Sequence, residues 1–203
     1  MIPPEEALRV ILEVVGILDD LQVPYAVGGS LASSMHGIPR STQDGDLLAD
    51  LRLEHMQPFV AAVADRFYVS PERALQAIQR RSSFNLVHLK TMIKVDIFVL
   101  KAEPFSLQEM TRRQVLPVPG EPGTTLHVAS AEDTVLQKLL WYQKGDRVST
   151  QQWNDILGIL KVQGAHLDFD YLKEWADRIE VDGLLRQAYD DAGVNPERTG
   201  GPR

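Results

Sequence analysis

Two aspartates separated by one glycine, Asp44 and Asp46, are the residues of this 203-residue chain whose spacing most directly suggests chemistry. On a strand, residues at i and i+2 point to the same face, so the two carboxylates would lie side by side. Neighbouring carboxylates repel each other, which raises the cost of ionising both. A hard divalent cation removes that cost, and Mg²⁺ is commonly held by a few carboxylates together with substrate phosphates. The pair therefore indicates a metal site, although Asp-x-Asp alone is a common pattern.

A glycine-rich turn precedes the pair. Gly28, Gly29 and Ser30 follow a predicted strand and precede a predicted short helix. Such a turn lets a phosphate approach the backbone closely, and the start of the helix offers free N–H groups. The Ser30 hydroxyl can donate one more hydrogen bond. The alternative is an ordinary strand-to-helix turn with a serine cap.

A third acid, Asp96, lies in the otherwise largely apolar run "IKVDIFVL". An aspartate within a buried strand is costly unless it is paired, hydrogen-bonded or bound to a metal. Alternation places Lys94 and Asp96 on one face of this strand, and that mixed face suits the rim of a site. The alternative is a solvent-facing residue on an edge strand.

Helical and strand patterns alternate around these residues. Residues 4–21 show helical spacing, and apolar runs at 84–89 and 93–100 with a short link predict a hairpin. The other predicted elements are strands near 23–29, 46–51 and 124–130, and helices near 30–37, 58–67, 70–81, 130–145, 150–164, 168–179 and 183–193.

The chain therefore divides into a mixed part and a helical part. We expect an α/β core over residues 1–128, a C-terminal helical region over 129–195 and a disordered tail over 196–203. The predicted fold class is α+β, with a mixed β-sheet, flanking helices and helices alone after the sheet.

Composition excludes several classes of protein. The chain has no cysteine, so disulfides, thiolate zinc sites and cysteine nucleophiles are ruled out. The acidic start lacks the features of a signal peptide, and no apolar run approaches the roughly 20 residues of a membrane span. We expect a cytoplasmic protein with no membrane partner. The net charge of −7 argues against a general nucleic-acid-binding surface.

Taken together, "GGS", "RSTQDGDLLADL" and "KVDIFVL" resemble the nucleotidyltransferase superfamily. That family has a Gly-Ser turn, an Asp-x-Asp or Asp-x-Glu pair, and a third acid on a later strand. The form R-x-T-x-D-x-D-L is especially similar to minimal bacterial members, including AbiEii-type toxins and relatives of aminoglycoside nucleotidyltransferases. The resemblance covers residues 23–100 and extends more loosely into the helical region. Gly45 departs from it, since relatives often carry an apolar residue there.

The resemblance implies a reaction and roles for particular residues. Asp44 and Asp46 would hold Mg²⁺, or Mn²⁺ in its place, and Asp96 would complete the metal site and act as the base. The turn would hold the β- and γ-phosphates of a nucleoside triphosphate (NTP). An acceptor hydroxyl would attack the α-phosphorus, and pyrophosphate would leave.

Two cations are further candidates. Lys138, on the helix that starts near Glu132, resembles a family lysine and is predicted to contact the triphosphate; the alternative is an exposed helix lysine. Arg40 is predicted to touch phosphate or the acceptor, with a surface arginine as the alternative. Arg147 and Asp155 could pair on neighbouring helices, and neither is assigned a role in the chemistry.

The sequence leaves three interpretations of function open. The first is a Mg²⁺-dependent enzyme that transfers a nucleotidyl group to a tRNA, a protein or a small molecule. The second is a nucleotide- or protein-binding module of the same fold without turnover. The third makes the chain one half of a toxin–antitoxin pair, with a cognate partner. The acceptor, the choice of NTP and the oligomeric state are not determined by the sequence.

Overall fold

The computed structural model describes residues 4–196 and divides the chain into two compact units. The first unit comprises the chain up to Leu31 together with Ser41–Val128, and the second comprises Ala32–Arg40 and the chain from Ala129 onward. Beyond position 196, the tail predicted to be disordered lies outside the described residues.

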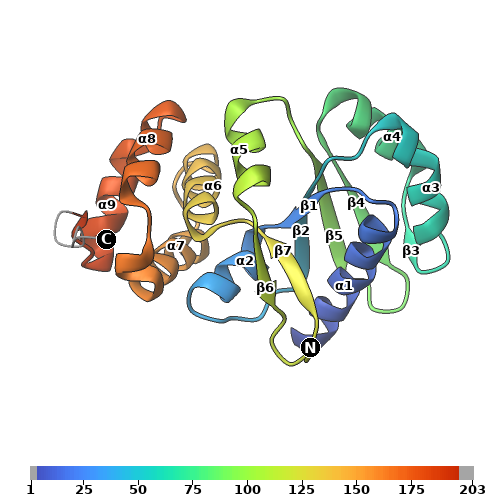
Figure 1. Cartoon of the computed structure of the whole chain (residues 1–203), viewed down its shortest axis with the longest axis horizontal. Coiled ribbons are helices and arrows are strands. Elements are labelled where there is room, and N and C mark those ends of the chain that lie inside the picture. The colour runs from blue at the N-terminus through green and yellow to red at the C-terminus, as the bar shows by residue number, and fades with distance from the viewer. Residues whose placement is uncertain (1–3, 197–203) are drawn as a thin grey trace. The chain divides into compact units, whose positions relative to one another are not determined.

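The first unit is built on a seven-stranded mixed sheet with strand order β3-β4-β5-β2-β1-β7-β6 (Figure 1). The predicted mixed sheet is thus confirmed, and so is the hairpin, in which β4 and β5 pair antiparallel. Strands β2 and β5 are parallel, whereas β1 and β2 are antiparallel. The strands are β1 Tyr25–Val27, β2 Asp44–Ala49, β3 Phe67–Tyr68, β4 Ser83–His88, β5 Lys94–Val99, β6 Gln114–Pro117 and β7 Thr125–Val128.

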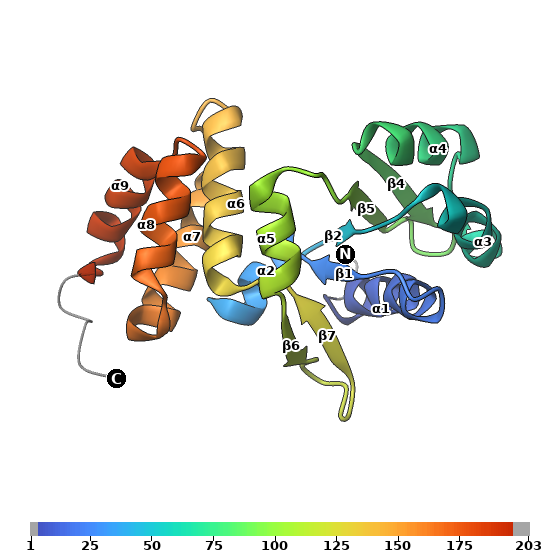
Figure 2. The same ribbon diagram turned by 45° about the horizontal axis from the view of Figure 1, so that its top comes forward.

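Helices cover one face of this sheet, and they include α1 (Pro4–Asp20), α3 (Leu53–Val63) and α4 (Pro71–Arg80) (Figures 1 and 2). Helix α4 begins as the sequence predicts: Ser70 is its N-cap and Pro71 is its first residue. Phe59 of α3 meets Phe84 of β4 edge to face, with ring centroids 6.1 Å apart. This face of the sheet carries the core of the first unit.

Three elements of the first unit were not predicted from the sequence: β3, β6 and helix α5 (Pro104–Arg112). Strand β3 has only two residues. Strand β6 is exposed at most of its positions, so it lacks the apolar alternation that marks a half-buried strand. Helix α5 has Pro at its start, but its buried apolar residues are only Phe105 and Met110, too few to give a clear helical pattern.

The second unit is helical, as the sequence predicts after residue 128 (Figure 2). Ser130 caps α6, and Gly145 and Gly164 follow the last residues of α6 and α7. Its C-terminal elements are α6 Ala131–Lys144, α7 Thr150–Gln163, the 3₁₀ turn η1 Gly164–His166, α8 Phe169–Arg178 and α9 Asp182–Ala192.

Residues 32–40, which the sequence analysis places in the first domain, group with the helical unit. Helix α2 (Gly29–His36) therefore begins in the first unit and ends in the second. Buried His36 lies with Nε2 2.7 Å from the Ala129 carbonyl oxygen, and Gln163 donates to the His36 carbonyl at 2.6 Å. A Cβ on Gly37 would lie 2.8 Å from the Ile159 backbone nitrogen, so this segment packs directly against α7. These contacts join positions far apart in the sequence, which explains why local pattern did not predict them.

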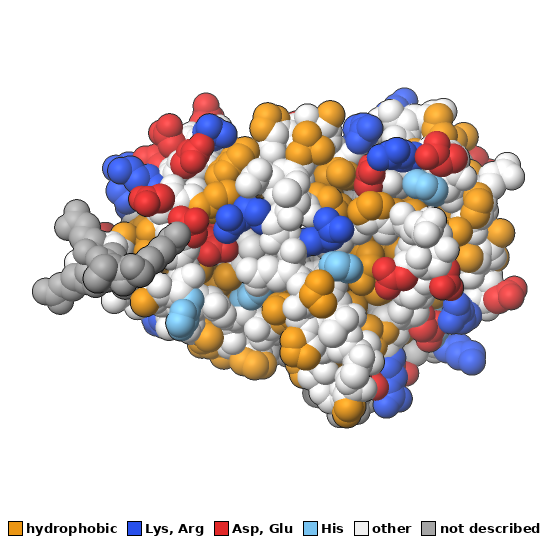
Figure 3. Space-filling model, in the orientation of Figure 1, with side chains coloured by type: hydrophobic (Ala, Val, Ile, Leu, Met, Phe, Trp, Pro, Cys, Tyr) orange, Lys and Arg blue, Asp and Glu red, His pale blue; other side chains and the backbone are white. Residues whose placement is uncertain are grey.

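No helix within residues 4–196 has the length and apolar character needed to cross a membrane. On the face drawn in Figure 3, Lys and Arg side chains are interspersed with Asp and Glu rather than gathered in one continuous basic stripe. This distribution agrees with the acidic net charge of −7.

Candidate functional site

The three predicted acids lie on two adjacent strands. Strands β2 and β5 pair in register, with Asp46 opposite Asp96 and Asp44 opposite Lys94. Paired Cα atoms on neighbouring strands are about 5 Å apart, so Asp46 and Asp96 are immediate neighbours. We call the face of β2 and β5 that carries Asp44, Asp46, Lys94 and Asp96 the acid face.

Alternation along each strand separates the acid face from the core. In β2, Gly45, Leu47 and Ala49 are buried, whereas Asp44 is exposed and Asp46 is partly buried. A Cβ on Gly45 would lie 2.6 Å from a side-chain carbon of Ile11 on α1. Glycine therefore lets α1 pack closely beneath the two acids, which gives a physical reason for glycine at this position.

The glycine turn lies directly beside Asp46. The Gly28 N–H donates to the Asp46 carbonyl at 2.9 Å, which extends the β1–β2 pairing by one residue. Gly29 has φ +55°. A Cβ added to Gly29 would overlap the Asp46 carboxylate and lie 2.8 Å from the Cβ of Asp46. Only glycine fits this position without strain. The fold thus brings the two ends of the segment from residue 28 to 46 together.

Thr42 is a residue to which the sequence analysis assigned no role. Its hydroxyl donates to the Asp44 carbonyl at 2.9 Å and also lies 3.4 Å from the Asp44 backbone nitrogen. These contacts fix the backbone where β2 begins. The threonine of the R-x-T-x-D pattern therefore supports the strand that carries the acids.

Lys94 is the second residue that the sequence analysis missed, although alternation placed it on the face of Asp96. Its Nζ lies 2.7 Å from Asp96 Oδ2, and the Lys94 side chain is 45% exposed against 24% for that of Asp96. The hydrogen bond to Asp96 raises the pKa of Lys94, and the charges of all three acids raise it further against the opposing effect of burial. Lys94 is therefore a cation on the same face as the predicted metal ligands, paired with one of them, Asp96.

The donor set of the acid face suits a hard divalent cation, because carboxylate oxygens are the ligands that Mg²⁺ prefers. The ammonium on Asp96 shows that this position already accommodates a positive charge. Within residues 4–196, however, no three His, Cys, Asp or Glu side chains converge as a ready-made metal cluster. The register of β2 and β5 makes Asp46 and Asp96 neighbours, but the three carboxylates do not converge on a single metal position.

The predicted phosphate contacts Arg40 and Lys138 belong to the second unit, where both pair with Asp155. Arg40 donates through Nε and Nη2 to the two Asp155 oxygens, each at 2.7 Å, and Lys138 Nζ donates to Oδ2 at 2.8 Å. Lys138 is 7% exposed, so it is not the exposed helix lysine of the alternative interpretation. The expected pairing of Asp155 with Arg147 is wrong, because Arg40, 115 positions away, takes that role.

Asp155 remains ionised although it is buried. Burial alone would raise the pKa of Asp155, but the hydrogen bonds from Arg40 and Lys138 and the charges of both cations outweigh burial and lower it. The cluster ties residues 32–40 to α6 and α7 within the second unit. Whether Arg40 and Lys138 contact a triphosphate stays a prediction.

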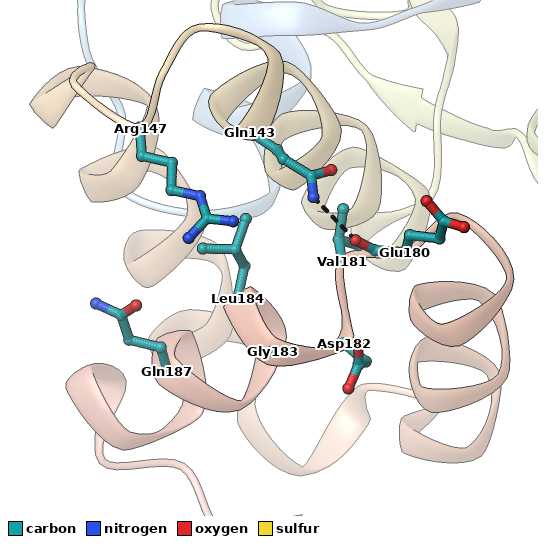
Figure 4. A pocket seen from close by; sticks show the side chains of 8 residues that line it. All are labelled: Gln143, Arg147, Glu180, Val181, Asp182, Gly183, Leu184 and Gln187. Atoms are coloured by element: carbon teal, nitrogen blue, oxygen red, sulfur yellow. Dashed lines mark hydrogen bonds between the residues drawn. The ribbon is translucent and has the colours of Figure 1, made fainter.

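A separate hollow of about 380 Å³ lies in the second unit beside the start of α9 (Figure 4). Gln143 of α6 donates to the Glu180 carbonyl at 3.0 Å and bridges to the turn before α9. Arg147 also lines this hollow, along with the acidic residue Asp182. None of the residues predicted for catalysis lines it.

We expect Gly29→Ala to destabilise the protein and to disturb the acid face. The left-handed φ costs about 1–3 kcal/mol for a residue with a Cβ, and the added methyl group would displace the Asp46 carboxylate. A thermal melt should show a melting temperature several degrees lower, since each kcal/mol shifts it by about 2–4 °C in a chain of this size.

Gly16→Ala is the matched control, because Gly16 lies in α1 with nothing within 4 Å of the added Cβ. That change should stabilise the protein by about 0.5–1 kcal/mol. A Gly29→Ala variant that melts at the wild-type temperature would show that the turn does not pack against Asp46.

Comparison with protein-family models found no match, and comparison with curated proteins found none either. Solved structures do match. The solution structure of the antibiotic-resistance factor ANT(2'')-Ia is 15% identical, with a TM-score of 0.52 over 90% of this chain and 92% of that one. A crystal structure of an antigenic nucleotidyltransferase-like protein from Paracoccidioides brasiliensis is 16% identical, with a TM-score of 0.55 over 96% and 97%. The chain has the nucleotidyltransferase fold, as the sequence predicted.

Proposed function

We propose that the chain transfers a nucleotidyl group from an NTP to an acceptor hydroxyl and releases pyrophosphate, in a reaction that depends on Mg²⁺. The observation that carries the proposal is the contact of the Gly28–Gly29 turn with Asp46, which in turn lies in register with Asp96. The turn that we predict to bind phosphate thereby lies beside two carboxylates of separate strands. The fold supports the same reaction, since nucleotidyltransferases share it.

The reaction assigns tasks to the glycine turn and to the three acids. The backbone N–H of Gly29 and the hydroxyl of Ser30 would bind the β- and γ-phosphates. Asp44, Asp46 and Asp96 would hold Mg²⁺, which when bound neutralises the phosphates and stabilises the attacking and leaving oxygens.

Asp96 would also act as the general base. One of its carboxylate oxygens accepts the proton of the acceptor hydroxyl as the new bond to the α-phosphorus forms. The bond from that phosphorus to the bridging oxygen breaks, and pyrophosphate takes the electron pair. Asp96 is suited to this task because its side chain is 24% exposed, so an acceptor can reach it.

A small molecule is the acceptor that we favour. A crystal structure of ANT(2'')-Ia, 14% identical with a TM-score of 0.50, contains adenylyl-2''-tobramycin, so that relative in fold carries an adenylylated small molecule. The net charge of −7 disfavours tRNA, whose phosphates require a basic surface. A protein acceptor and a toxin–antitoxin partnership stay predictions of the sequence alone.

A labelling experiment tests the proposal. The protein is incubated with Mg²⁺ and each of four α-labelled NTPs, together with aminoglycosides, bulk tRNA or mixed protein as acceptors. We expect label to pass to the small-molecule class with equimolar release of pyrophosphate, and an Asp46→Asn variant to transfer none. Binding of NTP without transfer to any of the three classes would favour the non-catalytic nucleotide-binding module instead.

A further inference from the structure

Lys94 gives the acid face a positive charge of its own. It stands two residues before Asp96 on β5, and its Cα is paired with that of Asp44 on β2. The ammonium lies 2.7 Å from Asp96 Oδ2. Asp96, one of the carboxylates that would receive a divalent cation, therefore already pairs with a monovalent cation.

We propose that Lys94 is the resident counter-ion of the acid face: it holds Asp96 until a divalent cation arrives and thereby sets the affinity of the site for that cation. The inference rests on the proposed function, because it assigns Asp44, Asp46 and Asp96 as metal ligands. Lys94 is a positioning residue, since it acts through the Asp96 carboxylate.

Two opposing effects follow from this position. Without metal, the ammonium offsets the mutual repulsion of three carboxylates and keeps Asp96 oriented on the acid face. With metal, the same ammonium repels the incoming divalent cation and competes for Asp96 Oδ2. Lys94 should therefore stabilise the metal-free protein and weaken metal binding.

The side chain of Lys94 can yield its position. It is 45% exposed and has a flexible four-carbon stem, so the ammonium can leave Asp96 without moving β5. A displaced ammonium remains anchored beside the acid face, where its three donors can bind phosphate oxygens. The Lys94 ammonium would thus leave the Asp96 carboxylate and bind the triphosphate when the metal and its nucleotide enter the site.

The test compares Lys94→Met, which keeps the length of the stem without the charge, with Lys94→Arg, which keeps the charge. Mn²⁺ is titrated into the full chain without nucleotide and its free concentration is followed by electron paramagnetic resonance. We expect Lys94→Met to bind Mn²⁺ about tenfold more tightly than wild type, equivalent to about 1.4 kcal/mol, and Lys94→Arg to stay close to wild type. In chelator, Lys94→Met should melt at a lower temperature than wild type, by up to about 2–4 °C, because it loses one partly exposed ion pair.

Equal or weaker Mn²⁺ binding by Lys94→Met would overturn the role of Lys94, and if wild type still binds ATP with Mn²⁺ the proposed function stands. Tighter Mn²⁺ binding by Lys94→Met would support that role even if no variant binds ATP, a result that would overturn the proposed function alone. Lower stability without tighter Mn²⁺ binding would make Lys94 a structural residue and contradict the inference.

Discussion

Asp96→Asn should leave the protein folded and remove most of its turnover, by about 10²–10⁴-fold, since the change deletes a general base and a metal charge together. The side chain keeps its shape, and the lost contact with Lys94 is a partly exposed ion pair worth about 0–1 kcal/mol. Transfer of label or release of pyrophosphate measures the rate, and circular dichroism and a thermal melt report the fold.

The matched control is Asp50→Asn, which makes the same chemical change just after the end of β2. Asp50 pairs with Arg52 at 2.8 Å and has no task in the proposed reaction. That variant should retain wild-type turnover. Wild-type turnover in Asp96→Asn would show that the carboxylate is structural rather than catalytic.

Asp155→Ala should destabilise the second unit by about 3–5 kcal/mol, because it leaves the nearly buried Lys138 and the partly buried Arg40 without their shared carboxylate. At about 2–4 °C per kcal/mol, the melting temperature should fall by roughly 6–20 °C. The matched truncation Glu174→Ala removes an exposed i,i+4 ion pair with Arg178 and should cost well under about 1 kcal/mol. Similar melts for the two variants would contradict the account of this cluster.

The effect of Asp155 should also depend on pH. Its pKa is lowered in the folded protein, so its stabilisation is complete above the unfolded value of about 3.9 and is lost as the pH falls through the folded value. The difference in unfolding free energy between wild type and Asp155→Ala should be constant from pH 5 to 8 and shrink below about pH 4. A difference that already shrinks near neutral pH would mean that Asp155 is not held ionised by the two cations.

Local pattern was sufficient to place the three acids on one face of two strands. Alternation in "DGDLLADL" and "KVDIFVL" fixed which residues share a face, and the structure places Asp46 and Asp96 opposite each other on paired strands. The same alternation placed Lys94 beside Asp96, but only the structure shows that the two form an ion pair.

What pattern could not supply are contacts between positions far apart in the chain. The sequence suggested that Asp155 pairs with Arg147 on a neighbouring helix. Its partner is Arg40 instead, which lies 115 positions away in a loop without the apolar periodicity of a helix or strand. The contact of His36 with the Ala129 carbonyl likewise joins residues far apart in the sequence and was not predicted. Short or exposed elements such as β3 and β6 were missed because they bury too few side chains to leave a signal.

The central claim is that the acid face binds a triphosphate through a divalent cation held by Asp44 and Asp46, and a thermal melt tests it without knowledge of the acceptor. A ligand at about 100 times its dissociation constant adds roughly 2.7 kcal/mol of stability, so ATP or another NTP with Mg²⁺ should raise the melting temperature by several degrees. Nucleotide alone should do little, because the carboxylates of the acid face repel a triphosphate that has no metal ion. Mg²⁺ alone should also do little. The Asp44→Asn, Asp46→Asn double variant should lose the combined shift, whereas equal shifts in wild type and double variant with all four common NTPs would contradict the claim.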